Sequence, residues 1–177
     1  MEIVIIVIIG ISLSMDAFSL SICCGTGKIK TNFIYLLSFT VGLYHFFMPL
    51  MGMFLGHLIH NLIYLSMEYI VFIIFFILGI NMIVNSFKKI KPVILNNVYS
   101  ILLFSFAVSI DSFSAGIGIK FVSTNYLLCC IIFSICSSFF TFIGFKIGMN
   151  LSEKFKYSAS LLGGIALISF AFFYVLK

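Results

Sequence analysis

The stretch SMDAFSLSI at residues 14–22 recurs as SIDSFSAGI at residues 109–117, with five of the nine positions identical. Each copy places one aspartate, Asp16 or Asp111, inside an apolar run. An aspartate at the centre of a membrane-spanning helix costs about 2.5 to 3.5 kcal/mol on insertion scales. Two aspartates at equivalent positions therefore indicate a functional pair, and the recurrence indicates a duplicated fold.

The composition is that of an integral membrane protein. Of 177 residues, 63% are hydrophobic and 8% are charged, and the mean hydropathy is +1.28. A spanning helix needs about 20 mostly apolar residues. Apolar runs cover residues 3–24, 33–60, 66–87, 98–119, 126–145 and 157–176. We predict an all-α integral membrane protein with six transmembrane helices, the first of which is retained because it lacks the basic start of a signal peptide.

The repeat extends into the second and fifth runs. Small or polar residues recur at the same spacing in both, as Gly42, His45, Pro49, Gly52 and Gly56 and then as Ser134, Ser137, Thr141, Gly144 and Gly148. Such a face lets membrane helices approach closely. We predict two three-helix repeats, residues 1–90 and 91–177, in one membrane domain. Because three is odd, the second repeat is inverted relative to the first.

The lysines are spread along the connections between runs, which argues against a nucleic-acid partner and for a topology signal. Those after the first, third and fifth runs are Lys28, Lys30, Lys88, Lys89, Lys91, Lys154 and Lys156. By the positive-inside rule these connections face the cytoplasm. Both termini are then expected to face outward, with the lipid bilayer as the surrounding partner.

Oxygen-bearing side chains accompany the two aspartates. Ser12 and Ser19 share a helical face with Asp16, and Ser114 lies one turn from Asp111. Together with Ser137 and Thr141 of the fifth run, these serines predict a hydrophilic pathway. Carboxylate and hydroxyl oxygens suit Mn²⁺, Mg²⁺ or Ca²⁺ better than a thiophilic ion.

Three further residues are candidate ligands. His45 precedes Pro49 by four residues on the small-residue face, where it can bind the ion, relay protons or be hydrogen-bonded only. Asn81 and Asn85 lie one turn apart in the third run and can supply amide oxygens or link helices. The predicted metal site therefore comprises Asp16, Asp111, His45, Asn81 and Asn85.

Two buried carboxylates that lie close together repel one another and bind protons when no metal is present. An arriving cation would expel those protons. We expect this competition to couple cation export to proton entry. We expect no catalytic residue and no resident cofactor, with a divalent cation as the transported substrate.

These motifs resemble the bacterial manganese-efflux pump family of MntP type, within the LysE-like exporter superfamily. The resemblance rests on the two Ser-x-Asp-[Ala/Ser]-Phe-Ser elements, the Gly42-x-x-His45-x-x-x-Pro49 face and the Leu78-Gly79 and Leu162-Gly163-Gly164 segments. It implies manganese export across the bacterial plasma membrane, with essential roles for Asp16 and Asp111. The chain departs from the family where it has His45 in place of Glu or Gln, and Asn81 and Asn85 in place of charged residues.

Two other classes of protein can carry paired aspartates in membrane helices. An intramembrane aspartyl protease would need a Gly-x-Gly-Asp pattern, and neither aspartate here follows one. A non-transporting, sporulation-associated or structural membrane protein of the same fold is the remaining alternative. It predicts that replacing either aspartate by asparagine leaves the phenotype intact.

Overall fold

Helices form the regular structure of the protein. A computed structural model describes residues 2–25, 31–60, 67–87, 97–149 and 154–176. The helices are α1 (Glu2–Gly25), α2 (Thr31–His60), α3 (Met67–Ser86), α4 (Val98–Val108), α5 (Ile110–Ile119), α6 (Tyr126–Gly148) and α7 (Lys154–Val175). No strand occurs in these ranges, and the predicted all-α class is confirmed.

Five helical stretches of the described chain are long and apolar enough to cross a membrane. They are Ile3–Gly25, Asn32–Leu58, Glu68–Ser86, Val98–Ile119 and Tyr126–Gly148. The segment Leu161–Val175 of α7 is a shorter apolar helix. Their bounds follow the predicted runs closely, because both are set by where apolar residues end. These stretches identify a multi-pass membrane protein.

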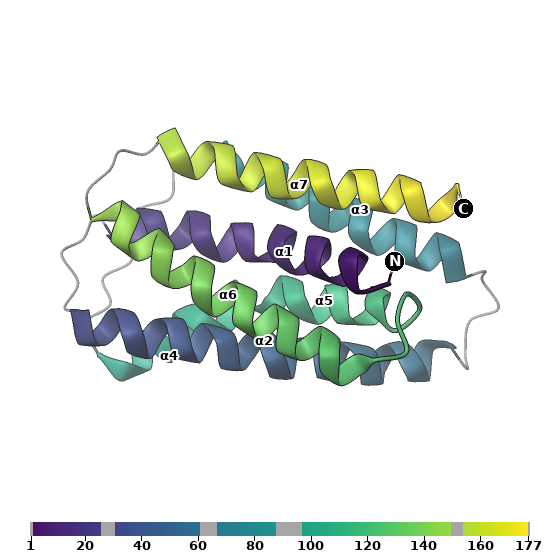
Figure 1. Cartoon of the computed structure of the whole chain (residues 1–177), viewed down its shortest axis with the longest axis horizontal. Coiled ribbons are helices and arrows are strands. Elements are labelled where there is room, and N and C mark those ends of the chain that lie inside the picture. The colour runs from purple at the N-terminus through teal and green to yellow at the C-terminus, as the bar shows by residue number, and fades with distance from the viewer. Residues whose placement is uncertain (1, 26–30, 61–66, 88–96, 150–153, 177) are drawn as a thin grey trace.

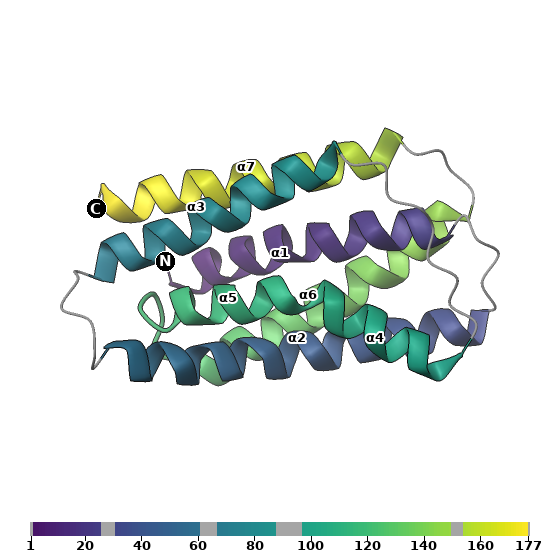
Figure 2. The same cartoon turned by 180° about the vertical axis from the view of Figure 1, so that it is seen from behind.

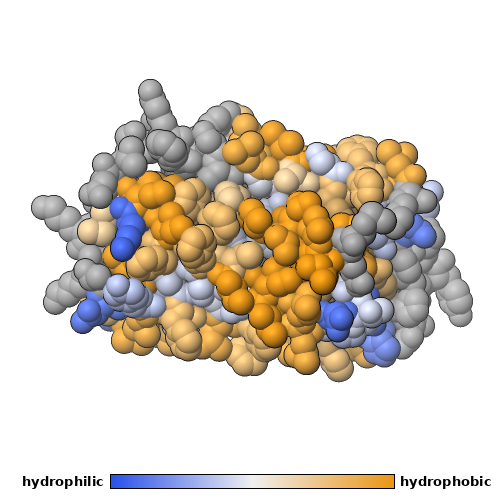
Figure 3. All heavy atoms as spheres, viewed as in Figure 1, coloured by the Kyte–Doolittle hydropathy of each residue, from blue (hydrophilic) through white to orange (hydrophobic). Residues whose placement is uncertain are grey.

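The outer surface is apolar where a bilayer would surround it. In Figure 3 hydrophobic residues occupy the middle of the molecule, and hydrophilic residues gather toward its two ends. Among the exposed side chains are Phe54 at 68%, Leu127 at 64% and Phe139 at 59%. A soluble monomer rarely exposes apolar area on this scale. The helices therefore present their large side chains to lipid.

The helices run roughly along one axis, and their packing brings distant parts of the chain together (Figures 1 and 2). α3 and α7 lie side by side along one edge. α1 packs against α6 and α7, whereas α2 packs against α5 and α6. α3 also contacts α5. Both ends of the chain lie at the same end of the bundle.

Glycines allow the closest helix contacts. A Cβ atom on Gly144 in α6 would lie 2.7 Å from the carbonyl oxygen of Phe18 in α1. A Cβ atom on Gly52 in α2 would collide with the carbonyl oxygen of Phe113 in α5. Both glycines belong to the predicted small-residue faces. Those faces therefore lie at helix crossings, as the sequence pattern indicated.

The apolar run 98–119 is divided into α4 and α5 at Ser109, which the sequence did not predict. Ser109 has φ −97° and ψ 2°, and its N–H donates to the carbonyl of Phe106 at 3.1 Å. Its hydroxyl also donates to the carbonyl of Ser105 at 2.7 Å, a bond that bends helices. Ser14 makes the same bond to Gly10 within the continuous α1. The back-bond alone therefore does not account for the break.

Candidate metal site

A cavity of about 260 Å³ contains both repeat aspartates. Asp16 reaches it from α1, Asp111 and Ser114 from α5, and Asn81 and Asn85 from α3. Its remaining lining is apolar and comes from Leu13, Leu78, Met82, Ala107, Val108 and Ile110. Both aspartates lie near the middle of their membrane stretches. Five of the ten predicted site residues thus line the same cavity.

Asp111 is held by the first turn of α5. Its Oδ1 atom accepts a hydrogen bond from the backbone N–H of Ser112 at 2.7 Å. The Ser112 hydroxyl also points to Oδ1 at a longer distance of 3.5 Å. The Oδ2 atom is buried and receives no hydrogen bond from any described residue. One oxygen is therefore fixed by backbone, and the other is available to a ligand.

The carboxylates of Asp16 and Asp111 lie close enough for their charges to repel one another. Burial strengthens this repulsion, because the surrounding protein and lipid screen charge less than water does. No lysine is among the described residues that line the cavity. A bound cation or bound protons would relieve this repulsion.

The other polar groups of the cavity are neutral oxygen donors. Asn81 and Asn85 lie one turn apart on α3 and contribute amides, and Ser114 contributes a hydroxyl. Within the described ranges, no three side chains drawn from His, Cys, Asp and Glu come together as a metal-binding group. The donor set is therefore hard oxygen with two charged members, which suits Mn²⁺, Mg²⁺ or Ca²⁺.

His45 does not line this cavity. It is fully buried in α2, and its Nδ1 atom lies 3.0 Å from the carbonyl oxygen of Val41 and 2.9 Å from Oγ of Ser109. Its Nε2 atom is buried without a hydrogen-bond partner among the described residues. His45 therefore contacts the break between α4 and α5, two residues before Asp111.

The predicted pathway serines of α1 are buried in the helix packing. Ser12 is 3% exposed, and its hydroxyl donates to the carbonyl of Ile8 at 2.8 Å. Ser19 is 2% exposed. Neither lines the aspartate cavity, although both share the helical face of Asp16.

The two pathway residues of α6 do not line the cavity either. Oγ of Ser137 lies 3.1 Å from Oγ of Ser14. Oγ1 of Thr141 is buried with no partner in the described part of the chain. The structure thus gathers the aspartates, the asparagines and Ser114, and it sets Ser12, Ser19, His45, Ser137 and Thr141 apart from them.

Comparison of the sequence with known proteins identifies its family. The family described as "Putative manganese efflux pump" matches residues 28–175. This chain belongs to the manganese efflux pump family. Proteins named "Putative manganese efflux pump MntP" are 34% identical over 170 residues in Bacillus velezensis, 32% over 170 residues in Bacillus licheniformis and 31% over 173 residues in Oceanobacillus iheyensis.

These efflux-pump relatives match the chain along nearly its whole length. The alignments cover 96%, 96% and 97% of this chain and 92%, 91% and 95% of the respective relatives. No solved structure matches the chain. The relatives are named for transport and not for catalysis, which agrees with the prediction that the protein is not an enzyme.

One part of the candidate site is not predicted by the sequence, namely the residues that support Asp111. Ser109 belongs to the repeat, but the sequence does not predict its contact with His45. No sequence motif marks Ser105, whose hydroxyl lies 2.8 Å from Oγ1 of Thr40 and whose carbonyl accepts from Ser109. The repeat is the sequence feature that could have indicated a role for Ser109, because Ser109 occupies the position of Ser14.

Proposed function

We propose that this chain exports Mn²⁺ from the cytoplasm and that the ion binds between Asp16 and Asp111. The observation that carries the proposal is the single cavity lined by both aspartates and by Asn81 and Asn85. Two carboxylates balance the charge of one divalent cation. Family membership supports manganese as the cargo, and Mn²⁺ is then a substrate and not a resident cofactor.

The oxygen donors of the cavity suit an ion that is bound and then released. Calcium sites bind more tightly as the number of charged ligands rises, and here two charged ligands are joined by neutral oxygens. Binding at such a site is weaker than in a site built of three or four carboxylates. This balance supports a transport role over a storage role.

The proposal includes two inverted repeats, and hydrogen-bonded pairs at related positions support it. Oγ of Ser14 lies 3.1 Å from Ser137, and Oγ of Ser109 lies 2.9 Å from Nδ1 of His45. Ser109 is the repeat partner of Ser14, and His45 is the repeat partner of Ser137. The contact of α1 with α6 therefore has a counterpart between α2 and the α4–α5 stretch.

Close glycine contacts support the same relation. Gly144 meets the carbonyl of Phe18, and Gly52 meets the carbonyl of Phe113. Gly52 and Gly144 are repeat partners, as are Phe18 and Phe113. In such inverted architectures the substrate site lies near the bilayer midplane at the repeat interface. We propose that the aspartate cavity occupies the corresponding place in this protein.

We further propose that protons compete with the metal for the two carboxylates. When Mn²⁺ leaves outward, protons replace it and relieve the repulsion between Asp16 and Asp111. Return of the protonated site to the cytoplasmic side then lets the next ion displace them. The result is exchange of cytoplasmic Mn²⁺ for external protons.

The orientation in the plasma membrane follows from charge. α1, α3 and α6 end at one end of the bundle, and Lys146 lies exposed in the last turn of α6. The predicted cytoplasmic lysines Lys28, Lys30, Lys88, Lys89 and Lys91 lie outside the described residues. We propose that this end is cytoplasmic and that both termini are outward.

The decisive experiment measures intracellular manganese in an exporter-deficient cell that expresses the wild type, Asp16→Asn or Asp111→Asn. We expect the wild type to lower intracellular manganese and both variants to fail at equal membrane abundance. Ser114→Ala is a milder cavity variant for comparison. A variant that lowers manganese as well as the wild type would exclude the aspartate site, and inactivity of the wild type would favour a non-transporting role.

A further inference from the structure

A second large cavity lies away from the aspartates, as a groove of about 770 Å³ along α2. Its walls come from α2, α5 and α6 and from the residue that follows α5. The apolar lining comprises Leu50, Met51, Met53, Phe54, Leu55, Leu58 and Phe113. The polar lining comprises His57, Lys120 and Tyr126. The groove is therefore long and apolar, with a small polar part.

The polar residues lie together at one end of the membrane stretches. His57 is in the last turns of α2, Lys120 follows the last residue of α5, and Tyr126 begins α6. The stretch Val98–Ile119 ends immediately before Lys120. From Leu50 to His57 the helix rises about 10 Å. The groove therefore runs from the membrane edge toward the apolar interior of the bilayer.

The ammonium of Lys120 is positioned by Tyr126. It donates to the Tyr126 hydroxyl and lies 4.6 Å from the centre of the Tyr126 ring. None of the described residues that line the groove is acidic. A cation at the mouth of an apolar groove, at the depth of the lipid headgroups, is complementary to a phosphate attached to an acyl chain.

We propose that this groove binds one anionic phospholipid. The phosphate lies at Lys120 and His57, and one acyl chain lies along α2 between Leu58 and Leu50. The lining offers exposed apolar side chains for that chain, with Met51 59% and Phe54 68% exposed. This lipid site does not follow from family membership or from the aspartate site. It is an additional ligand site on the outer wall of the bundle.

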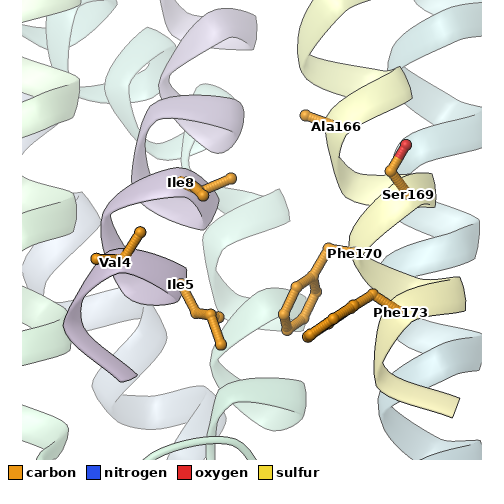
Figure 4. Close-up of a pocket in the computed structure, with 7 residues that line it drawn as sticks. All are labelled: Val4, Ile5, Ile8, Ala166, Ser169, Phe170 and Phe173. Atoms are coloured by element: carbon orange, nitrogen blue, oxygen red, sulfur yellow. The ribbon is translucent and has the colours of Figure 1, made fainter. Parts of the chain in front are cut away.

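Another groove, on different helices, provides an internal comparison. Between α1 and α7, Val4, Ile5, Ile8, Ala166, Ser169, Phe170 and Phe173 line a cavity of about 580 Å³ (Figure 4). The rings of Phe170 and Phe173 point toward α1. No charged side chain is among these residues. Lipid tails can fill this groove without selecting a headgroup, so headgroup selectivity distinguishes the two.

The test is native mass spectrometry of the full chain purified in detergent. The probes are phosphatidylglycerol, phosphatidylcholine and inorganic phosphate, added separately. We expect one phosphatidylglycerol retained per chain, little phosphatidylcholine and no retained phosphate. Lys120→Gln should weaken phosphatidylglycerol retention about fivefold. The matched control is Lys146→Gln, because Lys146 also lies over an aromatic ring, Phe142, at 4.7 Å and is remote from the groove.

A second pair of variants tests the apolar part of the site. Met51→Trp fills the groove and should reduce phosphatidylglycerol retention, whereas Ala166→Trp fills the comparison groove and should not. Equal retention of both lipids by the wild type, or unchanged retention in Lys120→Gln and Met51→Trp, would overturn the proposal. A lipid-independent dimer lost in Met51→Trp would instead assign the groove to a second copy of the chain.

Discussion

The hydroxyl of Ser109 lies 2.9 Å from Nδ1 of His45, and this contact joins α2 to the break in the helix that carries Asp111. A hydrogen bond from His45 to the carbonyl of Val41 requires that Nδ1 carry the proton, because a carbonyl oxygen only accepts. The Ser109 hydroxyl donates to Ser105 and can accept from the same N–H. His45 is thus suited to hold the backbone before Asp111.

Replacement of His45 should separate this positioning role from a ligand role. In His45→Asn the side-chain amide nitrogen can take the place of Nδ1, whereas in His45→Gln the amide reaches toward the position of Nε2. We expect His45→Asn to retain more manganese export than His45→Gln, because the bonds to Val41 and Ser109 involve Nδ1. Export is measured as intracellular manganese at equal membrane abundance.

His45→Leu serves as the control that removes every polar contact. It leaves the buried hydroxyl of Ser109 with one hydrogen-bond partner fewer. Loss of a buried hydrogen bond lowers the free energy of unfolding by about 1 to 3 kcal/mol. Its unfolding temperature in detergent should therefore fall. If His45→Gln exports manganese well and His45→Asn does not, His45 acts through Nε2, as a ligand to the ion.

The two aspartates should oppose stability when no metal is bound. Asp111→Asn removes the repulsion that proton uptake must otherwise relieve, so the metal-free variant should unfold at the same temperature as the wild type or higher. Manganese at about 100 times its dissociation constant should stabilise the wild type by about 2.7 kcal/mol and the variant much less. Thermal unfolding in detergent, with and without Mn²⁺, measures both effects.

The contrast between metal-free and metal-bound protein is the essential part of this experiment. A general packing defect lowers the unfolding temperature in both conditions. A metal-free Asp111→Asn protein that is less stable than the wild type would therefore argue that the carboxylate is needed for the fold.

The sequence predicted the membrane stretches well, because the bilayer requires apolar side chains along the whole length of a spanning helix. Apolar residues continue through the hydrocarbon and stop at its edge, so the run 66–87 and helix α3 (Met67–Ser86) nearly coincide. It also paired Asp16 with Asp111, because the repeat makes them equivalent. Both predictions rest on information that is local or duplicated along the chain.

The sequence could not predict which polar groups face the cavity. Helical spacing places Ser12 on the face of Asp16, yet its hydroxyl turns back to the carbonyl of Ile8. Ser114 has the same kind of relation to Asp111 and does line the cavity. The difference arises from the neighbouring helices. The break at Ser109 likewise involves His45, 64 residues away, which no local pattern encodes.

Manganese binding should weaken as the pH falls. Protons and the metal compete for Asp16 and Asp111, so lower pH raises the fraction of the site that is occupied by protons. We expect the apparent dissociation constant for Mn²⁺ to rise with acidity. In Asp111→Asn it should rise less steeply, because each ion then displaces about one proton fewer. Equilibrium dialysis of the purified protein against Mn²⁺ at several pH values measures this. Equal slopes for the two proteins would contradict proton competition at Asp111.

The same competition predicts how transport responds to the proton gradient. Collapsing the gradient across vesicles that contain the wild type should abolish uphill manganese movement and leave downhill movement intact. Uphill movement that continues without the gradient would show that another source of energy drives export, whatever the pH dependence of binding.

Replacing one neutral oxygen donor by a thiol should change the ion preference. Asn81 lines the cavity beside the aspartates, so Asn81→Cys places a soft ligand next to the bound ion. Soft ligands favour thiophilic metals, and Cd²⁺ should then compete with Mn²⁺ more strongly than in the wild type. Ile80→Cys is the matched control, because Ile80 is the preceding residue of α3, is 40% exposed and does not line the cavity. Stronger Cd²⁺ competition in both variants would mean that the added thiol acts at a distance from the site. Stronger competition in Asn81→Cys alone would locate the ion beside Asn81.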